Sequence, residues 1–466
     1  MTTDVNLREL VLEVLLAVTR DHAYSHLVIR EMLEKYQYLG KQERSFLKRV
    51  CEGTLEQMIW IDYVINQFSS VKVNKMKPQI RCILRSSVYE LKYMDAIPAS
   101  ATCNEAVKLA QKRGFRNLKG FVNGVLRTVS RNLDKISLPD REQEPVRYLS
   151  VKYSMPEWIL QLWQTYPLEQ VEEMLQSFLM EAPTVIRINP LKTTKEELRQ
   201  ELMADHITVR EDEEVPGVFY LEGYDFLRKI PSFREGKFYV QDTSSMQVAI
   251  CACPKPGDYI LDVCAAPGGK SIHLAELLWE AENGAATGGE MDNQAAVQGV
   301  MNCKAEGNQD TAIRGMVEAR DVTAQKVSLI EENINRCGLP NICAVQADAR
   351  ILDEDKVGKA DIVVADLPCS GLGVLARKAD IKYRVTLEEC RKLRDLQRQI
   401  LHTVQQYVKP QGILIYSTCT INPMENEENV SWFLREHADF RLELQRQIWP
   451  GKGKNDGFFL AKMRKG

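Results

Sequence analysis

The chain has 466 residues and a mass of 53.2 kDa, with 44% hydrophobic and 27% charged residues. This composition excludes a wholly disordered or collagen-like chain, and the length predicts two to four domains at about 100–200 residues each. No run of about 18 apolar residues occurs, so no membrane span is expected. The N-terminus lacks the apolar stretch of a secretory signal, and twelve cysteines are too few for a disulfide scaffold. We therefore expect a cytoplasmic protein with reduced thiols.

Charge is unevenly distributed along the chain. Residues 1–139 hold 22 Lys and Arg against 14 Asp and Glu, whereas residues 140–466 hold 39 against 50. A basic block ahead of an acidic remainder indicates a nucleic-acid-facing module joined to a second domain, although chance surface charge can give the same balance.

The first 139 residues have the pattern of amphipathic helices. Apolar residues at i, i+3 and i+4 spacing recur in five segments, 7–18, 46–64, 83–91, 107–110 and 121–129. Thr102 and Glu105 have the spacing of a capping box, which predicts a helix start at that point. Seven basic residues and no acid lie between Lys108 and Arg131, a pattern that favours contact with phosphates. We predict an all-α RNA-binding domain over 1–139.

The next region is predicted to be a linker followed by a small α/β element, together 140–235. The helical periodicity is lost over 132–150, where proline and charge increase. Beyond it, strands are predicted at 185–188 and 218–221, with a helix at 195–203.

Residues 236–466 alternate between short β-rich runs and helical patterns. This order predicts right-handed crossovers and a parallel, doubly wound sheet, whose ligands lie beyond the carboxyl ends of the strands. The predicted strands are 259–264, 316–321, 342–346, 361–366 and 413–417, and the clearest helices are 324–336 and 387–407. Residues 280–315, rich in Gly, Ala, Asn and Gln, interrupt the alternation and are interpreted as an insertion of no assigned function.

A glycine-rich motif follows the first strand of this region. It reads DVCAAPGGKS over 262–271, between a strand and a helix, where glycines allow close approach of a ligand and a helix N-terminus offers free N–H groups. Its end resembles a phosphate-binding P-loop. However, Cys264 stands where that motif needs its first glycine, which disfavours ATP or GTP hydrolysis.

Acidic residues follow the next two predicted strands. Asp321 is suited to accept hydrogen bonds from a ribose. It lies 59 residues after Asp262, or 23 without the 36-residue insertion, close to the usual separation of about 20. Asp292 is the alternative, although it follows no strand. Together with Asp348, these strand-end acids predict a nucleoside pocket. No metal is expected, because the chain lacks a C-x-x-C pair and its six histidines are scattered.

Two cysteines follow two further strands, Cys369 in DLPCSGLG and Cys419 in YSTCT. Buried cysteines often serve only as small apolar groups, but these two have polar, proline-containing surroundings and could converge on one pocket. A thiolate can activate the weakly nucleophilic C5 of cytosine by adding to C6. Such chemistry also needs an acid near the base, for which Asp366 is suited if it is buried beside few cations, and a second proton-handling group.

The motifs LDVCAAPGGK, DLPCSG and STCTINPMENEENV, in this order, resemble the RNA 5-methylcytosine methyltransferases of the Nop2/Sun family. The helical region with FVNGVLR resembles NusB-like RNA-binding modules. This pairing is similar to that of bacterial enzymes acting on small-subunit (16S) ribosomal RNA. The resemblance covers nearly the whole chain apart from 280–315.

The resemblance implies an all-α NusB-like domain, a small α/β element, and a Rossmann-like class I methyltransferase domain over 236–466. It implies S-adenosylmethionine as the cofactor and single-stranded or locally opened ribosomal RNA as the substrate. Cys419 is implied as the nucleophile at C6 and Cys369 as an aid to product release, with Asp366 and Lys270 contacting the target base. The residues implied to surround the cofactor are Cys264, Ala265, Ala266, Pro267, Gly268, Gly269, Lys270, Asp321, Asp348 and Asp366. We expect a monomer without a membrane partner.

Three alternatives remain open at this point. The substrate could be transfer RNA, or the chain could be a non-catalytic RNA-binding assembly factor. Methylation of an exocyclic amino group fits poorly, because its usual Asn/Asp-Pro-Pro-aromatic loop is replaced here by Asp-Leu-Pro-Cys.

Three cations follow the Cys369 motif and could guide RNA phosphates or be merely solvated: Arg377, Lys378 and Arg384.

Overall fold

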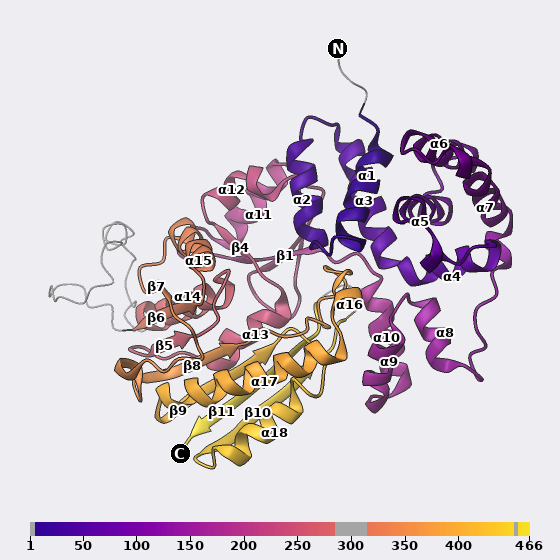
Figure 1. The fold of residues 1–466 in the computed structure, drawn as a ribbon. Coiled ribbons are helices and arrows are strands. Elements are labelled where there is room, and N and C mark those ends of the chain that lie inside the picture. The colour runs from indigo at the N-terminus through magenta and orange to yellow at the C-terminus, as the bar shows by residue number, and fades with distance from the viewer. Residues whose placement is uncertain (1–4, 285–314, 452–454) are drawn as a thin grey trace. The chain divides into compact units, whose positions relative to one another are not determined.

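The computed structural model describes residues 5–284, 315–451 and 455–466 (Figure 1). The chain forms two compact units, one of Met1–Met180 with Leu375–Thr386 and the other of Glu181–Val374 with Leu387–Gly466. Most of the predicted insertion, and Asp292 with it, lies outside the described residues. Among those that are described, no helix has the length and apolar character needed to cross a membrane.

The first unit, called the helical unit below, is built from α-helices, as predicted. Helix α5 contacts α1, α3, α4, α6 and α7 and so lies at the centre of their shared apolar core; Figure 1 shows it end-on among its neighbours. The helices are α1 Leu7–Thr19, α2 Ser25–Lys35, α3 Lys41–Glu56, α4 Met58–Phe68, α5 Pro78–Tyr93, α6 Ala99–Lys112, α7 Lys119–Asn132, α8 Pro145–Lys152, α9 Glu157–Leu162, α10 Leu168–Phe178 and α16 Ile381–Arg384.

One helix start differs from the sequence prediction. Helix α6 begins at Ala99 with Pro98 as its N-cap, so Thr102 lies inside the helix and the predicted capping box is wrong. The Thr102 hydroxyl instead donates a hydrogen bond of 3.1 Å to Oε2 of Glu90 in α5. Glu90 also pairs with Arg8 at 2.6 Å. Thr102 is buried, and a tertiary partner satisfies its hydroxyl in place of the local backbone.

Helices also occur where the sequence predicts a linker. Pro145 starts α8 at a position where proline is favoured, because the first helical N–H has no partner within the helix. Val151 in α8 joins the core of the helical unit. Helices α9 and α10 follow, and the helical unit continues to Met180.

Leu375–Thr386 is a returning segment that belongs to the helical unit although it follows the Cys369 motif in sequence. Asp380 is buried and accepts hydrogen bonds from the hydroxyl (2.5 Å) and backbone N–H (3.2 Å) of Ser25. Nζ of Lys382 donates to the carbonyl of Glu56 at 2.8 Å. The guanidinium of Arg384 lies 3.7 Å from the ring centroid of Tyr24. Arg384 therefore has a structural partner, unlike the solvated or phosphate-guiding residue that the sequence suggested.

The second unit, called the sheet unit, begins with a small antiparallel sheet in the order β2-β3-β1-β4. Its strands are β1 Thr184–Ile188, β2 Thr208–Glu211, β3 Val218–Glu222 and β4 Phe238–Val240, with helices α11 Lys195–Ala204 and α12 Pro231–Arg234. A true capping box, Thr194 with Glu197, starts α11. The predicted small α/β element is confirmed, and two strands, β2 and β4, were missed.

The main sheet of this unit has seven strands in the order β10-β11-β9-β8-β5-β6-β7. Strands β9, β8, β5, β6 and β7 are parallel, as predicted, and β11 and β10 add an antiparallel edge. The strands are β5 Tyr259–Asp262, β6 Met316–Asp321, β7 Ile342–Gln346, β8 Ala360–Asp366, β9 Val408–Thr418, β10 Phe440–Ile448 and β11 Phe458–Lys465.

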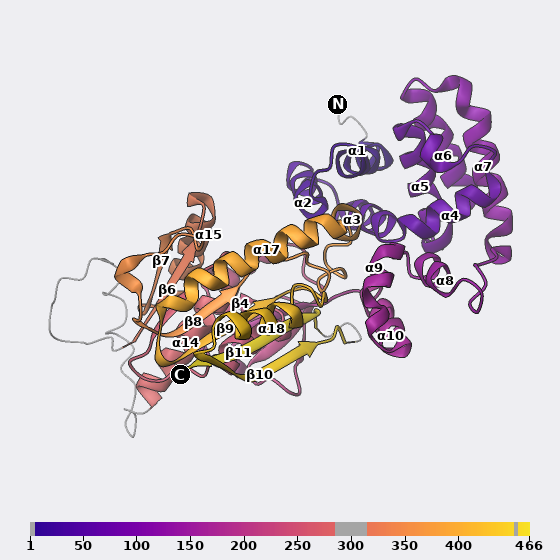
Figure 2. The same ribbon diagram turned by 60° about the horizontal axis from the view of Figure 1, so that its bottom comes forward.

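Helices cover both faces of this sheet. Successive strand residues point to opposite faces, so Ile260 of β5 packs into one apolar core and Leu261 into the other. One core contains side chains of α13 Thr243–Ala252, α14 Gly269–Gly284 and α15 Ala324–Cys337, and the other contains those of α17 Leu387–Val404 and α18 Glu427–Glu436. Figure 2 shows α17 and α18 lying along strands β8 to β11.

Candidate active site

The predicted motifs lie together at the carboxyl ends of the parallel strands of the main sheet. Strand β5 ends at Asp262, and its neighbours β6 and β8 end at Asp321 and Asp366. In the parallel register Asp366 lies beside Ser417, two residues before Cys419. Motifs that are up to 157 residues apart in sequence therefore share the carboxyl ends of adjacent strands.

Lys270 and Asp366 form an ion pair at these strand ends. Lys270, in the first turn of α14, places Nζ 2.7 Å from Oδ2 of Asp366, and the Ser417 hydroxyl donates to Oδ1 at 2.8 Å. The condition stated from the sequence for Asp366 to act as a protonated acid, burial beside few cations, is therefore not met. Burial disfavours the charged form of Lys270, but the charge and hydrogen bond of Asp366 outweigh it and raise the Lys270 pKa. In this pair the ammonium is the donor and the carboxylate the acceptor.

The two motif cysteines are adjacent, with their Sγ atoms 3.3 Å apart. The hydrogen bond to Cys419, together with burial, raises the pKa of the Cys369 thiol well above its usual value. Gly373 closes the loop after Cys369, and a Cβ there would overlap the carbonyl of Gly457 and crowd that of Cys419, so only glycine fits. The predicted convergence of the two cysteines is thus present in the geometry.

Glu425 was quoted within the sequence motif but given no role, and it lies at the centre of a buried network. Its Oε2 accepts hydrogen bonds of 2.9 Å from the backbone N–H of Ser370 and from Nε2 of Gln397. Its Oε1 accepts from Nδ2 of Asn422 at 2.6 Å. Glu425 thereby joins the loop after Cys369, the loop after Cys419, and helix α17. The same run also contains the half-buried Glu427 and the exposed Glu428, so no periodic pattern in the sequence distinguishes Glu425 as the buried acid.

Asp262 is a second site residue without an assigned role in the sequence analysis. It is 1% exposed and accepts hydrogen bonds from the Ser271 hydroxyl (2.6 Å) and the Cys264 N–H (3.4 Å). Burial, with a contribution from the charge of Asp366, raises its pKa to about 7 despite those hydrogen bonds. Burial and the charge of Asp262 likewise raise the pKa of the Cys264 thiol.

The glycine-rich turn is held by Asp321. One carboxylate oxygen accepts from the Ala266 N–H at 3.1 Å and the other from the Val322 N–H at 2.8 Å. Gly268 has φ +105°, a conformation that side chains rarely adopt. Asp348, predicted to join this group, forms an ion pair with Arg350 at 2.5 Å, and Asp321 likewise pairs with Lys326 at 3.1 Å. The structure thus brings Asp321 directly to the turn of Ala265, Ala266, Pro267, Gly268 and Gly269, and gives Asp348 a local cation.

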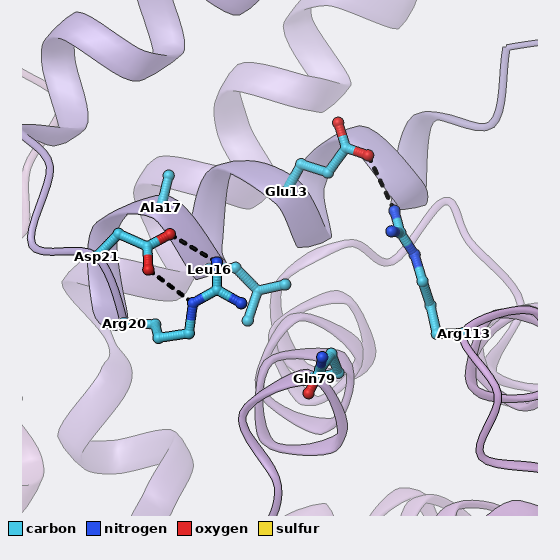
Figure 3. Close-up of a pocket in the computed structure, with 7 residues that line it drawn as sticks. All are labelled: Glu13, Leu16, Ala17, Arg20, Asp21, Gln79 and Arg113. Carbon is cyan, nitrogen blue, oxygen red and sulfur yellow. Dashed lines mark hydrogen bonds and ion pairs between the residues drawn. The ribbon is translucent and has the colours of Figure 1, made fainter.

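The helical unit contains a cavity of about 410 Å³ between α1, α5 and the end of α6 (Figure 3). Its charges are paired: Arg20 with Asp21 at 2.7 Å, and Arg113 with Glu13 at 3.0 Å.

Lys112 and Lys108, from the basic stretch, pair with Glu9 and Glu105. Acids distant in sequence or earlier in the helix therefore neutralise part of that stretch. Its other cations are exposed, Arg116, Lys119, Arg127 and Arg131.

Comparisons with known proteins agree with this fold. Family models match the chain as 16S rRNA methyltransferase RsmB/F (residues 249–313 and 302–464), NusB family (5–131), and the ferredoxin-like domain of RsmF/B-like methyltransferases (155–224). The "Probable ribosomal RNA small subunit methyltransferase B" of Bacillus subtilis is 33% identical over 99% of both chains.

Two solved structures share the fold. The crystal structure of PH0851 is 24% identical, covers 100% of both chains and has a TM-score of 0.77. The structure of NSun6 from Pyrococcus horikoshii with SFG is 23% identical, covers 66% of this chain and 97% of its own, and has a TM-score of 0.54.

The fold and the glycine-rich strand end define an S-adenosylmethionine-dependent methyltransferase with an N-terminal NusB domain. The full-length match and the family models place it more narrowly: the chain belongs to the 16S rRNA methyltransferase RsmB/F family. The resemblance stated from the sequence motifs is confirmed at this level.

Proposed function

We propose that this protein methylates C5 of a cytosine in 16S ribosomal RNA through a covalent adduct between Cys419 and C6 of the base. The observation that carries the proposal is the 3.3 Å cysteine pair beside the Lys270–Asp366 ion pair. The substrate class is taken from the named relatives, which are ribosomal RNA small subunit methyltransferases.

The residues at the glycine-rich turn are suited to the cofactor. Asp321 and Asp348 are carboxylates at the ends of neighbouring strands and can accept hydrogen bonds from ribose hydroxyls or an ammonium group. Gly268 has a φ of +105°, which side chains rarely adopt, so a glycine at this position permits the turn. In the proposal these residues and Cys264–Gly269 surround S-adenosylmethionine, which supplies an electrophilic methyl group when bound.

In the proposed reaction the thiolate of Cys419 forms a bond to C6, and the ring electrons make C5 nucleophilic. Lys270, oriented by Asp366, donates a hydrogen bond to the base and offsets the negative charge that develops on it. After C5 has gained the methyl group, its proton passes to water, the C5=C6 bond re-forms, and the C6–S bond breaks so that Cys419 leaves as the thiolate. Cys369, within contact of Cys419, is proposed to assist this release.

The domains are proposed to divide this work. Residues 1–139 form the NusB-like RNA-binding domain, 140–235 the linker and small α/β element, and 236–466 the methyltransferase domain. We propose that the protein acts as a cytoplasmic monomer on RNA that is single-stranded or locally opened.

The cysteine roles predict opposite effects of two substitutions. Cys419→Ala removes the nucleophile, and we expect no 5-methylcytosine in 16S ribosomal RNA by bisulfite mapping of cells that lack the native protein. Cys369→Ala blocks release, and we expect a covalent RNA–protein adduct that survives denaturing electrophoresis. Cys253→Ala, at an exposed free thiol, is the matched control. Full methylation by Cys419→Ala would refute the covalent mechanism, and a signal confined to transfer RNA would refute the substrate.

A further inference from the structure

Each of the two cysteines has a charged residue nearby, and the two charges are of opposite sign. Lys270 and Cys419 are close enough for the thiolate charge to contribute to the raised pKa of Lys270. Glu425 contacts the loop of the other cysteine, because its carboxylate accepts from the backbone N–H of Ser370, the residue after Cys369. A cation favours the charged form of a neighbouring thiol, and an anion disfavours it.

The hydrogen bonds of Glu425 fit an ionised carboxylate. All three donors, the Ser370 N–H, Gln397 Nε2 and Asn422 Nδ2, point hydrogens at its two oxygens, and an ionised carboxyl only accepts. The donors themselves are held, because Gln397 Nε2 also donates to the Pro368 carbonyl at 2.8 Å and its Oε1 accepts from Asn429 at 2.8 Å. Glu425 is 0% exposed, so water does not screen its charge. Burial raises the pKa of Glu425, and the hydrogen bonds from Ser370, Gln397 and Asn422 act in the opposite direction and favour the ionised form.

We propose that Glu425 is a positioning residue that fixes the two cysteine loops against each other and keeps Cys369 protonated, so that Cys419 is the thiol that ionises. Cys369 then donates its S–H to the Cys419 thiolate, and the proton lost by Cys419 goes to water. The pKa of Cys369 is raised by its bond to Cys419, by burial and by the charges of Cys419 and Glu425, in agreement with this direction. The order in which the two thiols ionise matters only if the proposed covalent chemistry holds, so this inference rests on the proposed function.

The test measures the thiols directly and needs no RNA. The full-length protein is treated with iodoacetamide at pH 6 to 10, and the rates at Cys369 and Cys419 are read from their peptides by mass spectrometry. In the parent protein we expect Cys419 to react at lower pH than Cys369. Glu425→Gln keeps the size of the side chain but removes its charge, and we expect the Cys369 rate near pH 8 to rise by up to about tenfold, the change that one pKa unit produces.

Two further variants make the result decisive. Glu428→Gln removes a charge from the exposed side of the same segment and is expected to leave both profiles unchanged. Asn422→Ala removes one donor to Glu425 and favours its protonation, so it is expected to shift Cys369 in the same direction by a smaller factor, and it decides the question if Glu425→Gln does not fold. Unchanged alkylation of Cys369 in the folded variants would overturn the inference. If the parent protein did not methylate 16S ribosomal RNA, the proposed function would be refuted, and the alkylation result would still stand.

Discussion

Asp262 is a buried acid of the candidate active site whose pKa lies near neutral pH. Among the residues that the structure describes, the hydrogen-bond partners of its carboxyl are the Ser271 hydroxyl and the Cys264 N–H, and neither is a cation. Burial therefore dominates and raises its pKa from 3.8 to about 7. Between these two values the folded protein holds a proton that the unfolded chain has released, so the contribution of Asp262 to stability decreases as the pH rises.

This linkage predicts a pH-dependent difference between the parent protein and Asp262→Asn. The amide cannot ionise, so from pH 5 to 7 the parent should lose stability relative to the variant by up to about 1.4 kcal/mol per pH unit. Above pH 7 the difference should level off. Denaturant titrations of both proteins at each pH give the comparison, and parallel stability curves from pH 5 to 7 would show that Asp262 does not titrate as stated.

At the scale of elements, the returning segment Leu375–Thr386 joins the sequence of the Cys369 motif to the core of the helical unit. Its buried contacts are specific: Asp380 to Ser25, Lys382 to the Glu56 carbonyl, and the Tyr383 hydroxyl within 3.4 Å of the Ser154 hydroxyl. Burial lowers the pKa of Lys382 to about 8 and raises that of Glu56 to about 7. Burial would not shift these pKa values if the segment were merely solvated, so the shifts agree with a docked segment.

Removing one buried contact of this segment should destabilise the helical unit. Asp380→Ala leaves the Ser25 N–H and hydroxyl without their acceptor, which should cost about 1–3 kcal/mol of unfolding free energy. Glu388→Ala, just beyond the segment, breaks only the exposed 3.7 Å pair with Lys392 and should cost no more than about 0.5 kcal/mol. Denaturant unfolding followed by tryptophan fluorescence compares the two, and equal losses would count against a docked segment.

At the scale of the whole molecule, the structure pairs some cations of the basic stretch with acids, so the charge asymmetry of the sequence overstates the cations that are available to RNA. The basic stretch of the helical unit loses Lys108, Lys112 and Arg113 to pairing with acids, as shown in part in Figure 3. The other four cations of the stretch, Arg116, Lys119, Arg127 and Arg131, remain for phosphates. Contact with RNA is therefore expected from a smaller set of residues than the sequence suggested.

Because only some of these cations have acid partners, we expect two sets of substitutions to change the salt dependence of RNA binding to different extents. Changing Arg116, Lys119, Arg127 and Arg131 together to Ala should reduce the slope of log K against log salt by up to about 3 for single-stranded RNA, at about 0.7 per phosphate contact. Changing Lys112 and Arg113, which already have acid partners, should reduce it by less per residue. Fluorescence anisotropy with a 16S ribosomal RNA fragment at several salt concentrations measures both, and equal effects per residue would contradict the expectation.

The sequence by itself determined the helical character of the first 139 residues, the parallel strands of the main sheet and the residues that stand at the ends of those strands. These follow from hydrophobic periodicity and from motifs, which are local properties of the chain. Which partners those residues have was decided only by the tertiary structure. Register and burial set the contacts of Asp366 with Lys270, of Glu425 with Ser370, and of Thr102 with Glu90. Such contacts join residues from 12 to 96 positions apart, and no local pattern encodes a distance of that kind.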